Sequence, residues 1–224
     1  MFVKFASVTV EICHLFARKC HIQTPQMLYL ASRSPRRREL LTDAGYTFKT
    51  VFPPSEYEEP IRDSETPHDY VQRLASDKAW AVALLTDMLS TWTADDIILG
   101  CDTIVCADNF GSTEILGKPA DRDDARRMLS MLSNTTHRVI SGIALVKPCN
   151  KTIITTADTT TLRMRHLTAA ELDGYIESGL WQGKAGAFGL QDKNDWLEVV
   201  EGSYTNIVGL PMEKIKTLLK QWML

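Results

Sequence analysis

The stretch MLYLASRSPRRRELL, residues 27–41, contains an apolar run, a polar turn and then a helix-type pattern. Residues 27–31 have the length and composition of a buried strand. Ser34 suits the N-cap of the helix that follows, because its hydroxyl oxygen can accept a hydrogen bond from an early helix amide. Pro35 suits the first helical position, where a missing N–H has no cost. The stretch therefore predicts a strand, a turn and a helix that ends near Gly45.

The start of this predicted helix has the chemistry of an anion-binding site. Its free amides and the positive end of the helix dipole point out of the N-terminus. We expect the hydroxyls of Ser32 and Ser34 and the arginines at 36–38 to converge on the same point. A surface helix with a basic first turn is the alternative, but cations at an N-terminus oppose the dipole unless an anion neutralises them. Phosphate is the expected anion.

Composition and charge limit the kind of protein. At 224 residues and 44% hydrophobic content, the chain can bury a core as one domain or two closely joined lobes. A net charge of −3 gives no global attraction for nucleic acid. No apolar run approaches the ~18 residues that a membrane span requires. Five cysteines without a pattern fit a reducing compartment, so we expect a soluble cytoplasmic protein without membrane partners.

The most apolar predicted strand, residues 97–107, contains a single charge, Asp102. An ionised carboxylate inside a buried strand is costly unless it meets a cation, a metal or strong donors. A capping role at the strand end fits poorly, because the strand pattern continues through Cys106. The position of Asp102 therefore indicates a catalytic or metal-binding role.

A second isolated charge lies on the predicted helix at residues 67–88. Its apolar face has a 3.6-residue spacing and comprises Val71, Leu74, Ala75, Val82 and Leu85. Lys78 falls in the middle of that face. A lysine there must extend its ammonium to solvent or meet a buried anion. A central position makes the first outcome harder, so the pattern favours the second.

Five ordered motifs resemble those of the Maf family, the septum-formation-related nucleotide pyrophosphatases. They are LASRSPRRRELL at 30–41, GCDTIV at 100–105, GKP at 117–119, KAG at 184–186 and VGLP at 208–211. The resemblance implies an α/β fold with a mixed central sheet, flanking helices and a cleft between two lobes, similar to inosine triphosphate pyrophosphatases. The alternation of strands and helices favours the same class. There is no Walker A motif and no dinucleotide fingerprint.

The activity that this resemblance implies is hydrolysis of a nucleoside triphosphate to the monophosphate and diphosphate. Such chemistry needs neutralised phosphates and an in-line water. Spacing alone does not distinguish this cleavage from loss of the γ-phosphate. The implied phosphate ligands are Ser32, Ser34, Arg37, Lys78 and Lys118. Asp102 is the implied proton acceptor, acting on water directly or through Mg²⁺ or Mn²⁺.

Two loops complete the implied site. Glu59, in an otherwise solvated acidic loop, aligns best with the family's functional acid and would assist Asp102 at the metal, with Glu58 as the neighbouring alternative. The glycine loop at residues 182–191 departs from the family, because Gly183 stands where an aspartate usually precedes KAG. If that aspartate binds metal, its role passes to Asp102 and Glu59.

The base is expected to be a pyrimidine. Its pairing edge presents a carbonyl and an N–H, and the glutamine amide offers both a donor and an acceptor. Within the family, arginine, threonine and glutamine at the positions of Arg36, Thr103 and Gln191 resemble the branch that acts on dTTP and UTP. A tryptophan replaces this arginine in the branch that prefers a methylated guanine nucleotide. We therefore predict dTTP and UTP as substrates, with modified pyrimidines also accepted.

Other interpretations remain open at this stage. The main rival is a regulator of cell division without turnover that binds nucleic acid or nucleotide, and the acidic net charge disfavours it. A phosphorylation site at Ser34 is disfavoured by the predicted cap. The expected partner is a small-molecule nucleotide, and a homodimer is left open. We expect the functional domain to span residues 27–224. Residues 1–26 are expected to form an extension that is disordered, a presequence, an extra helix or a start-site artefact.

The remaining elements are predicted from periodicity and turn residues. They are a strand at 46–52, a turn at 108–111, a helix capped by Asp121, strands at 137–146 and 152–167, a helix from the Thr168 capping box to Gly179, a strand at 196–200, a loop or strand at 204–208 and a helix at 210–222. The threonine-rich residues 155–161 suit an outer strand.

Overall fold

The computed structural model describes residues 26–54, 59–85, 87–109, 112–192 and 195–222. The elements are β1 (Leu28–Ala31), α2 (Pro35–Asp43), β2 (Phe48–Thr50), α3 (Pro67–Ala83), β3 (Ile97–Asn109), β4 (Ser112–Leu116), α4 (Arg122–Leu132), β5 (Thr136–Lys147), β6 (Thr152–Met164), α5 (Ala169–Ser178), η1 (Ala185–Ala187), η2 (Leu190–Asp192), β7 (Leu197–Glu201), α6 (Tyr204–Val208) and α7 (Met212–Trp222).

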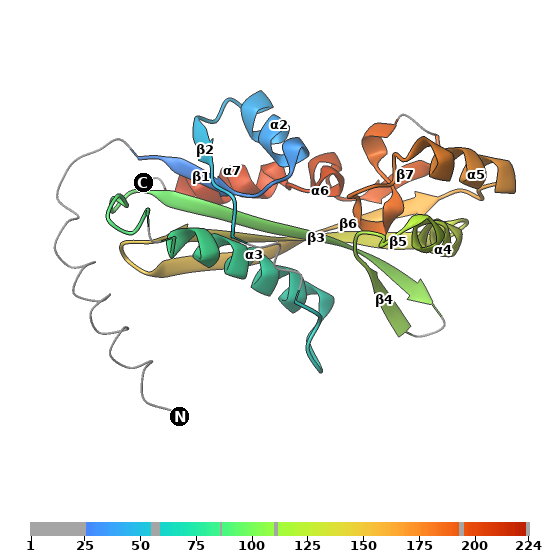
Figure 1. Ribbon diagram of the computed structural model, residues 1–224, viewed down its shortest axis with the longest axis horizontal. Helices are drawn as coiled ribbons and strands as arrows, with labels where there is room; N and C mark the ends of the chain where they lie inside the picture. The colour runs from blue at the N-terminus through green and yellow to red at the C-terminus, as the bar shows by residue number, and fades with distance from the viewer. Residues whose placement is uncertain (1–25, 55–58, 86, 110–111, 193–194, 223–224) are drawn as a thin grey trace.

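The strands form one mixed seven-stranded sheet in the order β2-β1-β3-β5-β6-β7, with β4 also paired to β3. β1 is parallel to β2 and β3, whereas β3, β5, β6 and β7 are successively antiparallel. Because successive strand residues face opposite sides, Leu28 and Leu30 pack with α2 and α7, and Tyr29 and Ala31 pack with α3. The helices therefore cover both faces, as Figure 1 shows.

One edge of β3 is shared by two different strands. β1 pairs with its first residues, Ile97 to Gly100, and β4 pairs with its last, Val105 to Asn109. β5 occupies the opposite edge from Ile98 to Ala107. Among the described residues, positions 101–104 therefore have no neighbouring strand on the first edge. Side chains from either face of the sheet can therefore reach the same space beside these positions.

Helix α3 lies unusually close to the sheet. A Cβ on Gly142 of β5 would lie 2.0 Å from the Val71 carbonyl oxygen, and one on Gly100 of β3 would lie 2.1 Å from that of Ala75. No side chain larger than hydrogen fits at either position. This approach holds the middle of α3 directly above the centre of β3.

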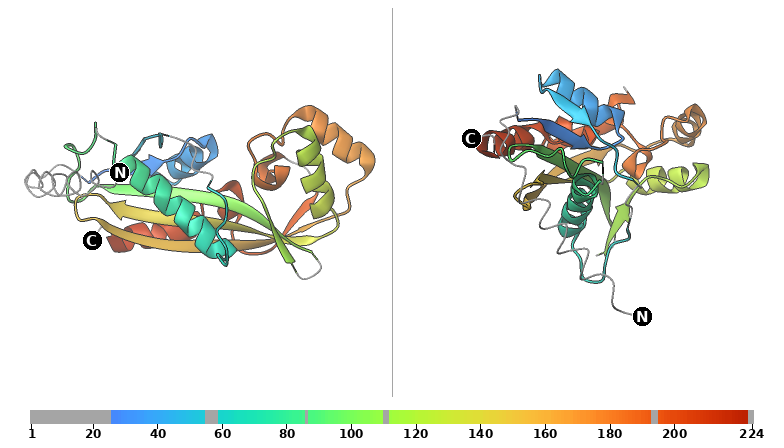
Figure 2. Two further views of the ribbon diagram at one scale, coloured as in Figure 1. Left: turned by 60° about the horizontal axis from the view of Figure 1, so that its bottom comes forward. Right: turned by 60° about the vertical axis from the view of Figure 1, so that its left-hand side comes forward.

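The second lobe lies at the other end of the sheet, where Figure 2 shows α4 and α5 together. Its separate core contains Leu129 of α4, Ile176 of α5, and Trp181 and Phe188 of the loop that follows. A mixed sheet with helices on its faces and two lobes confirms the predicted fold class. No helix of the described residues is long and apolar enough to cross a membrane.

The structure corrects several predicted elements. Helix α3 ends at Ala83 rather than near 88, and the buried Trp92 indole donates at 3.0 Å to the Ala83 carbonyl, which the helix end leaves without a helical partner. Residues 204–208 form helix α6 rather than a loop or strand, with Ser203 as N-cap and Gly209 as left-handed C-cap. β4 was not predicted. β3 continues into the predicted turn at 108–111, the rest of which, like residues 1–25, lies outside the described residues.

Candidate active site

A cavity of about 450 Å³ lies between the two lobes. Its walls come from the β1–α2 turn, the centre of β3, the glycine loop before η1, and the end of α6. The structure brings eight of the predicted site residues together there: Ser32, Ser34, Arg36, Arg37, Lys78, Asp102, Thr103 and Lys118. A volume of this size is in the range of small-molecule sites.

The two serines shape the start of α2. Ser34 is the N-cap, as predicted, and its Oγ accepts from the Arg37 amide at 3.5 Å. The buried Ser32 Oγ accepts from the Ser34 amide at 3.1 Å and from Arg37 Nη1 at 3.3 Å. In these bonds both hydroxyls act as acceptors. Each therefore keeps its own hydrogen to donate to a ligand oxygen.

Arg37 connects three elements. Its Nε donates to the Gly209 carbonyl at 2.7 Å, Nη1 to the Cys101 carbonyl at 2.7 Å, and Nη2 to Thr103 Oγ1 at 3.1 Å. With the Nη1 bond to Ser32, four guanidinium hydrogen bonds go to the protein. A guanidinium has five N–H groups, so Arg37 offers a ligand its charge and little further hydrogen bonding.

Adjacent residues of β3 face opposite sides of the sheet at its edge gap. Thr103 points to the α2 side, where it meets Arg37 and lies 2.9 Å from Ser141 Oγ. Asp102 points to the α3 side, where its carboxylate accepts from the Lys78 ammonium. Both residues nevertheless line one cavity, because none of the described strands covers the edge between them.

The pairing of Lys78 with Asp102 accounts for both isolated charges in the sequence. The two side chains are 15% and 14% exposed, so each is largely desolvated. Within the described part of the chain, the Asp102 carboxylate has no other hydrogen-bond donor. Its remaining lone pairs are available to a ligand in the cavity.

The cavity is strongly cationic. Its described lining contains Arg33, Arg36, Arg37, Lys78, Lys118 and Lys184 but a single carboxylate, Asp102. Desolvation and the neighbouring Arg37 lower the pKa of Arg36, as expected where cations are crowded. The third arginine of the cluster, Arg38, is exposed and does not line the cavity, because each helical step turns the side chain by about 100°.

The proposed base-reading residues are only partly described. Arg36 Nη2 donates to the Gly183 carbonyl of the glycine loop at 3.2 Å, so the two lobes meet at this bond. Gln191 lies in η2 at the end of that loop, but its side chain lies outside what the structure describes. Its proposed contact with a base therefore stays a prediction.

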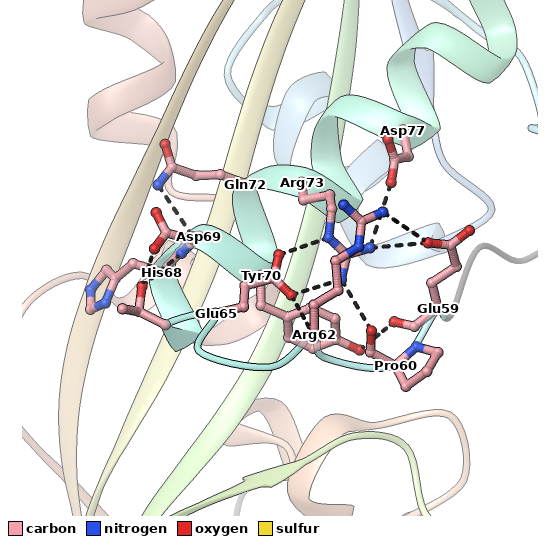
Figure 3. A network of polar contacts seen from close by, with 11 residues as sticks. Glu59, Pro60, Arg62, Glu65, His68, Asp69, Tyr70, Gln72, Arg73 and Asp77 are labelled. Atoms are coloured by element: carbon pink, nitrogen blue, oxygen red, sulfur yellow. Dashed lines mark hydrogen bonds and ion pairs between the residues drawn. The ribbon is translucent and has the colours of Figure 1, made fainter.

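Glu59 lies apart from the cavity. Figure 3 shows its carboxylate beside α3, where it accepts from Arg62 at 3.4 Å and from Arg73 at 3.3 Å. Its side chain is 52% exposed and does not contribute to the cavity wall. Glu58 lies outside the described residues.

The cavity fits a metal that arrives with a nucleotide better than a preformed metal centre. The described residues contain no group of three or more His, Cys, Asp or Glu that could hold a metal ion. Mg²⁺, however, is commonly bound by one or two carboxylates together with substrate phosphates. Asp102 is one such carboxylate on the cavity wall, whereas Glu59 lies apart from the cavity.

Sequence reasoning gave no role to three groups at this site. Arg33 lines the cavity, although the sequence suggested only that it separates two serines. The Gly209 carbonyl, in the VGLP motif, holds Arg37. Asp192, directly after Gln191, pairs with Lys184. The sequence shows that Asp192 follows the glycine loop, but only the fold shows that it contacts Lys184.

A mixed α/β sheet with a cation-lined cleft around one carboxylate defines a class of protein suited to binding polyphosphate anions. The chain belongs to the Maf family, because the family model described as Maf-like protein matches residues 27–222. The predicted family is thereby confirmed.

Curated relatives include bacterial proteins named dTTP/UTP pyrophosphatase. That of Cupriavidus pinatubonensis is 41% identical over 199 residues, covering 87% of this chain and 96% of the relative. That of Rhodopirellula baltica is 42% identical over 201 residues, covering 88% and 83%. Among solved structures, the Ham1 protein of Staphylococcus aureus matches 88% of this chain and 99% of its own, at 9% identity and a TM-score of 0.42.

Proposed function

We propose that this protein is a nucleoside triphosphate pyrophosphatase that hydrolyses dTTP and UTP to the monophosphate and diphosphate. The single observation that carries the proposal is the cavity, in which cations from both lobes surround one carboxylate. Its close relatives carry the name of this activity. The negative charge of a triphosphate would balance the excess positive charge of these side chains.

The phosphates would be bound by Lys78, Lys118 and the charge of Arg37, with hydroxyl hydrogens from Ser32 and Ser34. Their positive charge also stabilises the negative charge that moves to the leaving diphosphate. As phosphate oxygens compete for the Lys78 ammonium, the Asp102 carboxylate becomes free to accept a proton. The anhydride between the α- and β-phosphates then breaks as water adds and gives one proton to Asp102.

A divalent cation, Mg²⁺ or Mn²⁺, would supply Lewis-acid chemistry at the phosphates when bound. Asp102 would hold it through a carboxylate oxygen, and Glu59 would have to leave its arginine partners to help. Removing the divalent cation with a chelator should therefore abolish turnover, and adding back Mg²⁺ or Mn²⁺ should restore it. Full turnover in chelator would contradict this cofactor assignment.

The direct test is incubation with each nucleoside triphosphate and Mg²⁺ or Mn²⁺, followed by identification of the products. We expect monophosphate and diphosphate from dTTP and UTP, at higher kcat/KM than from purine nucleotides. Release of orthophosphate and a nucleoside diphosphate would contradict the assigned bond cleavage. A protein without turnover whose DNA binding falls steeply with salt would instead support the regulator.

Selectivity for the base would come from Arg36, Thr103 and Gln191. Gln191→Ala should reduce the preference for dTTP over GTP by roughly ten- to hundred-fold, as a lost buried hydrogen bond would. Gln182→Ala is the matched control, because this glutamine is exposed at the other end of the loop and does not line the cavity. If Gln191→Ala kept the wild-type selectivity, as Gln182→Ala should, the assignment of Gln191 would be wrong.

A homodimer and a cytoplasmic location stay predictions of the sequence.

A further inference from the structure

The glycine loop is closed by a buried ion pair that the reaction does not use. The Lys184 ammonium at its start donates to the Asp192 carboxylate at its end, and the two side chains are 10% and 5% exposed. The Tyr175 hydroxyl of α5 donates to the other Asp192 oxygen at 2.5 Å. Burial, reinforced by this carboxylate, raises the pKa of Tyr175, so the hydroxyl keeps its proton.

The segment closed in this way is the cavity wall that contacts Arg36. Gly183, Lys184 and Phe188 line the cavity, and the Gly183 carbonyl accepts from Arg36 Nη2 at 3.2 Å. Among the charges that act on the Arg36 guanidinium, Asp192 is one that favours its cationic form. Asp192 therefore acts on Arg36 through the Gly183 carbonyl, because the ion pair with Lys184 fixes the loop that carries this carbonyl.

The departure of Gly183 from the family pattern is consistent with this arrangement. Gly183 has a φ of +67°, a conformation that side chains rarely adopt, and it contributes only its carbonyl to Arg36. The counter-charge of Lys184 comes from Asp192. Within the described residues, the carboxylate of the loop is thus on its far side, next to Gln191.

We propose that Asp192 is a positioning residue for base selectivity, which fixes the glycine loop so that Arg36 meets a pyrimidine in one orientation. This inference rests on the proposed function. Asp192 does not line the cavity and would not touch the substrate. Its effect should appear in the binding of the base and not in the chemistry at the phosphates.

The test is Asp192→Asn, with steady-state kinetics for dTTP and GTP. An amide cannot balance the buried Lys184 charge, so the loop should loosen. We expect KM for dTTP to rise about tenfold, kcat to change by less than about threefold, and KM for GTP to change little, as loss of one oriented contact predicts. A proportional loss for both nucleotides, or unchanged selectivity in the folded variant, would overturn the proposal.

Two further variants make the result decisive. Glu65→Gln is the matched control, because it also converts a paired carboxylate to an amide, but beside Arg73 and away from the cavity. Its selectivity should equal that of the wild type. Tyr175→Phe keeps the ion pair and removes one hydrogen bond, so it should shift selectivity in the same direction by a smaller factor. If Asp192→Asn fails to fold, unchanged selectivity in Tyr175→Phe overturns the proposal.

Failure of the proposed function has a different signature. A wild-type protein that hydrolyses no nucleoside triphosphate, or that shows no pyrimidine preference, would contradict the proposed function itself. A wild-type protein with that preference and an Asp192→Asn variant that retains it would contradict only the role of Asp192.

Discussion

Helix α3 carries two ion pairs of almost equal burial that differ in what surrounds them. Arg73 and Glu65 have side chains that are 12% and 11% exposed, and Lys78 and Asp102 have side chains that are 15% and 14% exposed. The first pair joins the helix to the preceding loop. The second joins the helix to the centre of β3 and lines the cavity.

The first pair uses most of its hydrogen-bonding capacity within the protein. Arg73 donates twice to Glu65, at 2.7 and 2.8 Å, and also to the Pro60 carbonyl and the Glu59 carboxylate, as Figure 3 shows. Lys78 and Asp102 share a single hydrogen bond and keep unused donors and lone pairs toward the cavity. Burial alone therefore does not distinguish a structural ion pair from a catalytic one, but unused hydrogen-bonding capacity at a cavity does.

The strongest test of this distinction is Asp102→Asn. Loss of the proton acceptor should lower kcat for dTTP by about 10²- to 10⁴-fold. The variant should also lose about 1–3 kcal/mol of unfolding free energy, since Lys78 then lacks a counter-charge in a desolvated position. Single-turnover kinetics and urea unfolding measure the two effects. Activity within a few-fold of wild type would remove Asp102 from the mechanism.

A second test lifts α3 from the sheet. Gly142→Ala places a methyl group where the Val71 carbonyl lies, and should cost about 3 kcal/mol of unfolding free energy. Because Lys78–Asp102 spans helix and sheet, activity should fall as well, whereas Arg73–Glu65 moves with the helix. Gly174→Ala is the control: the site is open, and a helical alanine should stabilise by up to about 1 kcal/mol. Normal activity in Gly142→Ala would show that the close approach is dispensable.

Glu65→Gln tests the other ion pair. Removing the partner of a largely desolvated arginine should lower the unfolding free energy by about 1–3 kcal/mol. In contrast to Asp102→Asn, kcat/KM for dTTP should stay within about twofold of wild type, because the substitution leaves the cavity and its substrate contacts unchanged. Thermal unfolding and steady-state kinetics on the same preparation provide the comparison. A large kinetic defect in a folded variant would assign this network a role in turnover.

The smallest expected effect is in the pH dependence of stability. Hydrogen bonds and the charge of Arg73 lower the pKa of Glu65 from 4.5 to about 2. A depressed pKa adds stability above the unfolded value, and this contribution is lost as pH falls from about 4.5 to about 2. Urea unfolding at several pH values across this window should show that the unfolding free energy changes less steeply with pH for Glu65→Gln than for wild type. Equal slopes would mean that Glu65 titrates alike in both states.

Local patterns predicted much of the framework. The Ser34 cap, the Thr168 capping box and the Asp121 cap are all present, because each depends on hydrogen bonds within a few residues. The two isolated charges, Asp102 and Lys78, were also found from their apolar surroundings alone. Helix α6 was mistaken for a loop or strand because five residues are too few to show a helical period.

Contacts between distant residues needed the fold. Lys78 and Asp102 were each recognised as costly charges, but nothing in their local sequences showed that they neutralise one another. The sequence predicts that Arg37 binds phosphate, but it does not show that Arg37 joins α2 to Gly209, 172 residues further along the chain. Such partners depend on strand order and register, which no local pattern determines.

The sequence by itself thus determined the strand–turn–helix start, the family and the residues whose charge requires a partner. Those conclusions follow from backbone hydrogen bonding, apolar periodicity and the cost of desolvation, which act over short stretches. The tertiary structure decided which charges meet. None of the described strands pairs with residues 101–104 on one edge of β3, so Asp102 from one face and Thr103 from the other line a single cavity. That gap exists because β1 ends and β4 begins on the same side of β3, a consequence of sheet topology alone.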